Sequence, residues 1–280
     1  MKISFHMKKY IVMIIRFLEL IIPKNHIEDF LEFIYPKYKG FVRGTYNARQ
    51  IFYLVTGNKE GRKMVQNIHK IMPFTFVGIG GLEATYKLAK LMNEKGRMGN
   101  FVELGVARGG CAALMAMVAF ESDEDNRQLW LFDSFEGLPE PTNKDFCQNG
   151  SKKTGNHMKA LYKGSCLGQL EEVHELFFEI FDFPRDKVFF VKGWFQDTLP
   201  KRGKEVGEIA ILRIDGDWYE STMCCLEYFY DQVVSEGAVI IDDYQSCIGC
   251  KRALDEFIAK RKLNVNFLYD GRGGCYFIKP

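Results

Sequence analysis

Four aspartates close two neighbouring stretches of the chain that are predicted to be β-strands. Asp215 and Asp217 alternate about a glycine in "LRIDGDWYEST", and Asp242 and Asp243 end the apolar run "GAVIIDD". In an extended chain the side chains of Asp215 and Asp217 point to one face. Four carboxylates that converge in a low dielectric repel by several kcal/mol unless protons or a cation neutralise them. Mg²⁺ suits this set, because it binds one or two carboxylates and leaves positions for water and substrate oxygens.

The same acids also have a structural interpretation. They can cap helices, or they can pair with cationic side chains that lie nearby in the sequence. These cations are Arg213, Lys251 and Arg252.

A glycine-rich turn follows an earlier predicted strand in "VELGVARGGC". Gly105, Gly109 and Gly110 let the backbone approach a ligand and start the next helix close to the strand. Their order is G-x-x-x-G-G, whereas the dinucleotide fingerprint is G-x-G-x-x-G, and the Lys-Ser/Thr of a P-loop is absent. The turn therefore favours a ligand without a diphosphate.

Two further stretches complete a predicted nucleoside site. In "LFDSFEGLP" Asp133 ends a strand, followed by Ser134, and an acid in this position can accept from both hydroxyls of a ribose. In "KGWFQDTLP" Trp194 and Phe195 offer flat apolar surfaces, and Asp197 offers an acceptor for an amino group, as an adenine requires. A glycine turn, a ribose acid and an adenine pocket, in that order, suit S-adenosyl-L-methionine better than a dinucleotide.

The elements that must position these residues alternate in type from Asn100 onward. Alternating strands and helices predict a Rossmann-like α/β fold with a mostly parallel seven-stranded sheet covered on both faces. The last two strands are separated by only "GRG", a hairpin length, so the final strand should be antiparallel. The predicted strands are 100–106, 128–134, 187–193, 208–215, 237–243, 264–270 and 274–280, and the predicted helices between them are 109–120, 167–181, 219–235 and 249–262.

The first part of the chain has a different texture. Residues 1–97 contain apolar residues at helical spacing and predict a helical extension, for capping or oligomerisation, before a catalytic domain at 98–280. Within the extension, 10–22 is apolar but too short for a membrane span, and no signal-peptide cleavage site follows. We expect an amphipathic helix that packs on the body or on a second subunit, with membrane-surface attachment as the alternative. In the catalytic domain, the long polar stretch 139–165 predicts a lid over the active face.

Composition argues against several classes of protein. The 280 residues carry 38 basic and 36 acidic side chains, so the net charge of +2 gives no reason to expect a nucleic-acid partner. Eight cysteines in a chain of this length predict buried reduced thiols in a cytoplasmic protein rather than a disulfide framework. "CIGC" (247–250) has the spacing of half a zinc site or of a redox pair, but no second CxxC or His pair answers it at zinc spacing.

Read together, "VELGVARGG", "LFDSFEGLP", "KGWFQDTLP", "LRIDGDWYEST" and "VIIDDYQSCIGCKRALDEF" resemble the macrocin O-methyltransferase family, which includes the mycinamicin and novobiocin sugar methyltransferases. The resemblance covers roughly 75–280 and is weakest up to about residue 70 and in 139–165. It implies a class I methyltransferase that uses S-adenosyl-L-methionine and Mg²⁺ to methylate a hydroxyl of a sugar or glycosylated natural product. It also implies a homo-oligomer, a dimer or higher, formed through N-terminal helices.

The resemblance implies a role for each matching residue. Asp215, Asp242 and Asp243 would bind the metal, and Asp217 would be the catalytic base. The implied cofactor-binding residues are Glu103, Gly105, Gly109, Asp133, Ser134, Trp194 and Asp215.

Three other functions remain open at this stage. A catechol or phenolic O-methyltransferase would use the same metal-assisted chemistry on a planar acceptor, and an aromatic-lined pocket in 139–165 would favour it. A nucleotide-dependent oxidoreductase would need phosphate-cradling glycines, and the glycine order counts against it. A non-catalytic cofactor-binding regulator would not need the four aspartates.

Overall fold

The structure, a computed structural model, describes residues 42–121, 127–147, 154–155 and 161–280. The chain divides into two compact units, Met1–Arg62 and Lys63–Pro280. The apolar segment 10–22 and much of the predicted lid lie outside the described residues. The functions predicted for the extension and the lid therefore stay predictions.

In the first unit the described residues form a helix over 42–55, followed by the start of α3 (Lys59–Ile71). Within α3, buried Met64, Val65, Ile68 and Ile71 recur at intervals of three and four residues, the spacing of one helical face. No described helix is long and apolar enough to cross a membrane.

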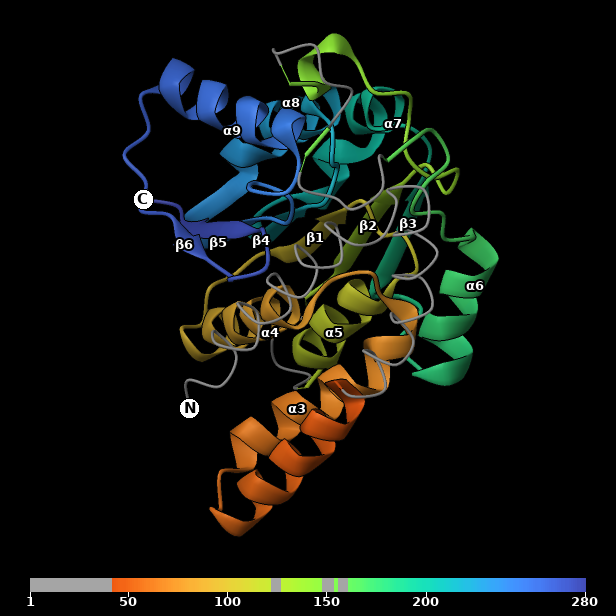
Figure 1. Cartoon of the computed structure of the whole chain (residues 1–280), viewed down its shortest axis with the longest axis vertical. Coiled ribbons are helices and arrows are strands. Elements are labelled where there is room, and N and C mark those ends of the chain that lie inside the picture. Colours follow the sequence, from red (N-terminus) through yellow and green to blue (C-terminus); the bar gives the residue numbers. More distant parts are fainter. Residues whose placement is uncertain (1–41, 122–126, 148–153, 156–160) are drawn as a thin grey trace, which may run out of the picture. The chain divides into compact units, whose positions relative to one another are not determined.

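The second unit is built on a seven-stranded sheet with the order β3-β2-β1-β4-β5-β7-β6 (Figure 1). The first five strands are parallel, and β7 pairs antiparallel with both β5 and β6. The predicted antiparallel final strand is therefore confirmed, and it lies between β5 and β6. The strands are β1 (Asn100–Leu104), β2 (Leu129–Asp133), β3 (Val188–Lys192), β4 (Ile209–Ile214), β5 (Val233–Ile241), β6 (Leu268–Tyr269) and β7 (Cys275–Ile278).

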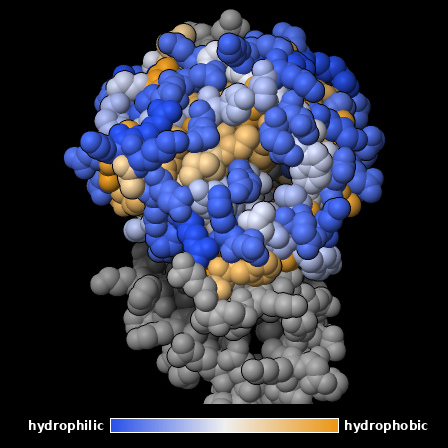
Figure 2. Space-filling model, turned by 90° about the horizontal axis from the view of Figure 1, so that it is seen from above, coloured by the Kyte–Doolittle hydropathy of each residue, from blue (hydrophilic) through white to orange (hydrophobic). Residues whose placement is uncertain are grey.

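Helices cover both faces of this sheet (Figure 1). On one face lie α4 (Ile79–Glu94) and α5 (Gly110–Ala119), and on the other α7 (Phe195–Arg202), α8 (Tyr219–Phe229) and α9 (Ile248–Arg261). A further helix, α6 (Leu170–Glu175), continues into a π-helical turn and packs beside β3, where His174 contacts Phe190. Figure 2 shows a face of the molecule that is mainly hydrophilic around a small, partly recessed apolar area.

The core explains why the central strands read as continuous apolar runs. Every residue of β4, Ile209–Ile214, is buried, because helices cover the sheet on both sides. Phe229 of α8 and Phe257 of α9 are fully buried against this sheet. Burial of each such side chain contributes about 1.5–3 kcal/mol to the stability of the fold. A well-packed core therefore supports the strand ends that carry the aspartates.

Several predicted boundaries were wrong, including the start of the strand predicted over 264–270, where β6 begins only at Leu268. The helix predicted over 219–235 ends at Phe229, and β5 begins at Val233, four residues before the predicted strand. The early part of β5 was missed because a bulge interrupts its pairing with β4 and Glu236 adopts a positive φ of 58°. Helix α7 was also missed, because it contains Pro200, which usually ends a helix.

Candidate active site

A cavity of about 660 Å³ opens at the carboxyl ends of the parallel strands. This edge of an open α/β sheet is where ligands bind. The sequence-predicted residues that line it are Gly105, Asp133, Ser134, Trp194, Asp215, Asp217, Asp242 and Asp243. The structure thus brings together eight of the ten catalytic, cofactor-binding and metal-binding residues that the sequence predicted. The other two, Glu103 and Gly109, do not line the cavity.

Glycine is required at Gly105 by the close approach of two strands. The residue adopts φ +90°, and a Cβ atom there would lie 1.8 Å from the carbonyl oxygen of Asp215. The Asp215 N–H donates to the Leu104 carbonyl at 2.8 Å, so β1 and β4 end side by side. Gly109 has a packing role instead, since a Cβ there would lie 2.7 Å from the Val173 side chain.

Asp133 organises the turn that follows β1. Its Oδ2 atom accepts hydrogen bonds from the N–H groups of Val106 (2.6 Å) and Ala107 (2.9 Å), and its Oδ1 atom accepts from Phe135 (2.7 Å). Burial raises the pKa of Asp133, and these backbone donors oppose the rise. The neighbouring Ser134 hydroxyl accepts from the Glu136 N–H at 3.1 Å, which fixes the following turn. Oδ2 already accepts two hydrogen bonds, whereas Oδ1 accepts one and keeps a lone pair that can accept from a hydroxyl.

Trp194 is half-buried and caps the N-terminus of α7 at the cavity wall. Phe195 and Gln196 also line the cavity, whereas Asp197 is exposed and does not. The acceptor predicted at Asp197 is therefore not part of the cavity wall, because Asp197 lies in the first turn of α7. The side-chain amide at Gln196 offers both a donor and an acceptor here.

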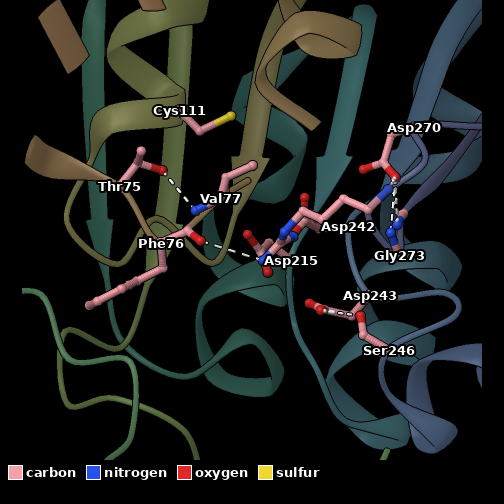
Figure 3. A network of polar contacts seen from close by, with 12 residues as sticks. Thr75, Phe76, Val77, Cys111, Asp215, Asp242, Asp243, Ser246, Asp270 and Gly273 are labelled. Atoms are coloured by element: carbon pink, nitrogen blue, oxygen red, sulfur yellow. Dashed lines mark hydrogen bonds and ion pairs between the residues drawn. The ribbon is translucent and has the colours of Figure 1, made fainter. Parts of the chain in front are cut away.

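Three carboxylates meet at the opposite wall. Asp215, Asp242 and Asp243 each offer an oxygen, and these oxygens lie within 4.8 Å of one another (Figure 3). The Ser246 hydroxyl donates to Asp243 Oδ1 at 2.7 Å, which orients that carboxylate. The prediction that these acids converge is confirmed.

A buried arginine lies beneath the cluster. Arg213 donates through Nη1 to Glu103 (2.7 Å) and Asp215 (2.9 Å), and through Nη2 to Asp242 (2.6 Å). Its side chain is fully buried on β4. The structural interpretation of the acids therefore holds for Arg213. It does not hold for the other two cations: Lys251 pairs with Asp255, and Arg252 donates to the Lys144 carbonyl.

Burial and mutual repulsion raise the pKa values of these acids, and the two arginines lower them. Burial raises the pKa of Glu103 to about 8, against the pull of Arg213, and one of its oxygens, Oε2, has no hydrogen-bond partner. Burial, with repulsion from Asp242, raises the pKa of Asp215 well above its usual range. Burial and Asp217 raise the pKa of Asp243 to about 7. Only for Asp242, within this set, do Arg213 and Arg272 outweigh burial and lower the pKa.

Asp217 reaches the cavity by a different backbone route from the one predicted. The strand ends at Ile214, and Asp217 adopts a left-handed φ of 52° in a tight turn closed by the Trp218 N–H and the Gly216 carbonyl at 2.5 Å. The extended conformation predicted for 215–217 was therefore wrong. A left-handed non-glycine residue is strained, and such strain is concentrated at functional sites.

Cys247 is a neighbour of Asp217 that sequence reasoning missed. Its thiol donates to Asp217 Oδ1 at 3.3 Å, and Asp217, Asp243 and Cys247 form a second group whose ligand atoms lie within 4.8 Å. Burial, with repulsion from Asp215, raises the pKa of Asp217 to about 7. All eight cysteines are described and none forms a disulfide; five are buried, as predicted, and Cys147, Cys166 and Cys224 are partly exposed. The spacing of the "CIGC" motif alone does not point to Cys247 as a site residue, because nothing in the sequence places this cysteine beside Asp217.

A second cation of the site, Arg272, was predicted only as part of the turn between the last two strands. It stands in the β6–β7 hairpin, and its Nη1 atom pairs with Asp242 Oδ2. Asp270 holds this hairpin by accepting from the N–H groups of Arg272 (2.6 Å) and Gly273 (3.0 Å) (Figure 3). No pattern in the sequence separates this arginine from any other in a polar turn.

The donor set fits a hard divalent cation. Carboxylate oxygens are the ligands that Mg²⁺ prefers, and three of them converge at a cavity that has room for further oxygen ligands. Five acids, Glu103, Asp215, Asp217, Asp242 and Asp243, face two guanidinium groups, so the cluster retains a negative charge wherever more than two acids are ionised. A divalent cation would neutralise that excess.

Comparison with solved structures defines the class first. The fold matches that of the O-methyltransferase NovP with a TM-score of 0.65 and 33% identity, covering 74% of this chain and 82% of that one. A calicheamicin methyltransferase, CalS11, shares the fold with a TM-score of 0.52 at 17% identity, covering 79% of this chain and 93% of that one. The chain thus has the fold of a class I methyltransferase.

The family follows from the sequence match. The model of the macrocin O-methyltransferase (TylF) family matches residues 35–278, and the chain belongs to this family of O-methyltransferases. It is 34% identical over 235 residues to demethyldecarbamoylnovobiocin O-methyltransferase of Streptomyces niveus, covering 84% of this chain and 85% of that enzyme. It is 29% identical over 204 residues to mycinamicin III 3''-O-methyltransferase of Micromonospora griseorubida, covering 72% and 77%.

Proposed function

We propose that the protein transfers a methyl group from S-adenosyl-L-methionine to a hydroxyl of a sugar or glycosylated natural product, with Mg²⁺ bound beside the acceptor. The observation that carries the proposal is the meeting of two kinds of residue in one cavity. Gly105, Asp133 and Trp194 line it together with the aspartates that end β4 and β5.

The donor would lie along the glycine turn. Asp133 would accept from a ribose hydroxyl with the Oδ1 lone pair that its backbone donors leave free. Trp194 and Gln196 would provide the flat surface and the polar edge for the adenine. Ser134 would support the turn, whereas Glu103 would act through Arg213, because it does not itself reach the cavity.

Asp215, Asp242 and Asp243 would hold the cation. When bound, Mg²⁺ supplies a Lewis acid that lowers the pKa of a coordinated hydroxyl and fixes its position. Arg213 holds Asp215 and Asp242 in place from below, and Ser246 holds Asp243. The three carboxylates therefore need little rearrangement to serve as ligands.

Asp217 would be the general base. Its pKa of about 7 lies near neutral pH, where a general base is most effective, and it lines the same cavity as the ligands. The Cys247 thiol would keep this carboxylate facing the acceptor.

The acceptor class rests on the relatives and on the cavity wall. Both relatives described above are O-methyltransferases whose names give the acceptor, demethyldecarbamoylnovobiocin for the first and mycinamicin III for the second. The described part of 139–165 contributes Pro139, Glu140, Thr142 and Leu161 to the cavity, none of them aromatic. A mixed polar wall suits a glycoside better than a flat catechol.

The test is a transfer assay with labelled S-adenosyl-L-methionine and a panel of glycosides and catechols, with Mg²⁺ or with EDTA. We expect label on a glycoside only with Mg²⁺. Titration calorimetry should show binding of S-adenosylhomocysteine but not of NAD or ATP. Full activity in EDTA would remove the metal, and labelling of catechols alone would replace the acceptor class.

We also propose that the protein is a homo-oligomer, a dimer or higher, formed through its N-terminal helices. In the helix over 42–55, large apolar side chains are more than half exposed, namely Ile51, Phe52, Leu54 and Val55. Light scattering coupled to gel filtration should give at least twice the mass of one chain, and Phe52→Glu should lower it. A monomer at all concentrations would contradict this.

A further inference from the structure

Asp242 differs from the other two proposed ligands, because both of its oxygens are already bonded to guanidinium groups. Arg213 donates to Oδ1 at 2.6 Å, and Arg272 pairs with Oδ2. A carboxylate in this state has its charge largely neutralised, so it can bind a metal cation well only if one guanidinium leaves.

Arg213 is held too firmly to be the one that leaves. Its side chain is fully buried on the central strand β4, and it also pairs with Glu103 and Asp215. Its departure would leave Glu103 and Asp215 without a cation, which costs several kcal/mol.

Arg272 is held by much less. Its side chain is 31% exposed, and its guanidinium contacts Asp242 and, at 3.4 Å, the carbonyl oxygen of Phe76. Its backbone is fixed independently, because Asp270 accepts from the N–H groups of the hairpin and Gly271 provides a positive φ of 74°. The guanidinium can therefore swing toward solvent without a change in the sheet.

We propose that Arg272 is a displaceable counter-ion of the metal site. Its guanidinium neutralises Asp242 when no divalent cation is bound, and it withdraws from Asp242 when the cation binds. The inference rests on the proposed metal site and goes beyond it by assigning a residue that sets the affinity of that site.

Two consequences follow from the contacts. A guanidinium a few ångströms from a divalent cation repels it, so Arg272 weakens metal binding. Withdrawal also breaks the contact with Phe76, which lies in the segment before α4 and lines the cavity (Figure 3). Metal binding would thus free one wall of the cavity for the acceptor.

The experiment titrates Mn²⁺ into the full-length protein and follows free Mn²⁺ by electron paramagnetic resonance. Arg272→Gln removes the charge and keeps a side chain able to donate to Phe76, and it should bind Mn²⁺ about tenfold more tightly or better. Arg272→Lys keeps the charge and should stay within about threefold of wild type. Arg261→Gln is the matched control, because it removes a guanidinium that pairs with Asp231 beyond the other end of β5, and it should change nothing.

Unchanged or weaker Mn²⁺ binding by Arg272→Gln would overturn the proposal, because the arginine would then be neutral to the metal or would support Asp242 as a ligand. A second measurement needs no variant. Phenylglyoxal modifies accessible arginines, and mass spectrometry of the wild-type protein should show more modification of Arg272 with Mg²⁺ than with EDTA. Equal or lower modification with Mg²⁺ would also count against it.

The two proposals fail in different ways. Asp243→Asn should abolish Mn²⁺ binding, which establishes that the titration reports this site. If wild type binds Mn²⁺, Asp243→Asn does not, and Arg272→Gln behaves as wild type, the counter-ion is refuted and the metal site stands. If wild type binds no Mn²⁺ at any concentration tested, the metal site itself is refuted, and the counter-ion with it.

Discussion

Replacing Arg213 by methionine tests whether this guanidinium is the structural cation of the active site. Methionine keeps much of the volume and removes the charge. Glu103, Asp215 and Asp242 would each lose a charge-assisted hydrogen bond of 2.6–2.9 Å, and of these acids Glu103 and Asp242 are buried while Asp215 is partly exposed.

The magnitude follows from these contacts. Three bonds to charged groups, at about 1.5–3 kcal/mol each, set an upper range of about 4.5–9 kcal/mol. The true loss is smaller, because the acids can take up protons and Arg272 remains on Asp242. Measured losses on breaking buried ion pairs are about 3–5 kcal/mol, and we expect that value. At about 2–4 °C per kcal/mol for a chain of this size, the melting temperature should fall by roughly 6–20 °C.

The assay is thermal and urea unfolding at pH 6 and pH 8 in EDTA. The folded variant must hold protons on buried acids that the unfolded chain releases, so its stability falls as the pH rises. Each additional proton retained costs about 2.7 kcal/mol more at pH 8 than at pH 6, since one pH unit corresponds to 1.36 kcal/mol.

The control is Arg261→Met. Arg261 pairs with Asp231 at the surface, where the two side chains are 33% and 65% exposed, and its loss should cost at most about 1 kcal/mol. If Arg213→Met were as stable as this control, or were destabilised equally at both pH values, the assignment of Arg213 as the cation that balances the buried acids would be wrong.

Three shorter predictions address the rest of the site. Gly105→Ala should destabilise the protein by more than about 2 kcal/mol in urea unfolding, because a Cβ there would lie 1.8 Å from a backbone oxygen. An unchanged free energy of unfolding would refute the close approach of β1 and β4. The melting temperature of the metal-free protein should fall from pH 5 to pH 7.5, because Asp217 and Asp243, with folded pKa values of about 7, keep protons that the unfolded chain releases above pH 4. Mg²⁺ should reverse this loss. A melting temperature that rises with pH would contradict those pKa values. Cys247→Ala should lower kcat about 2- to 12-fold with unchanged S-adenosylhomocysteine affinity, and Cys247→Ser should retain most of the wild-type kcat. An equal loss of kcat in both variants would contradict a role for the hydrogen bond to Asp217.

The fold could be predicted because its pattern is local. The alternation of buried apolar runs with helical spacing gave seven strands close to their observed positions, and the three-residue gap before β7 gave its direction. The errors occur where local patterns mislead. The bulge at Glu236 hid the start of β5, and Pro200 hid a helix that tolerates it.

The acids of the site could be predicted because strand ends of a parallel sheet converge. The sequence did not reveal what neutralises them. Arg213 was weighed only as an alternative to the metal, yet its three ion pairs leave room for both roles. Arg272 and Cys247 were missed because their importance arises from contacts with residues 30 positions away in sequence, Asp242 and Asp217.

The most direct test of the account is anomalous diffraction from a crystal grown with Mn²⁺ and S-adenosylhomocysteine. We expect one strong Mn²⁺ peak bonded to oxygens of Asp215, Asp242 and Asp243, with the ligand along the glycine turn and the Arg272 guanidinium withdrawn from Asp242. Occupied ligand with no peak at the three aspartates, or a peak bound elsewhere, would contradict the account.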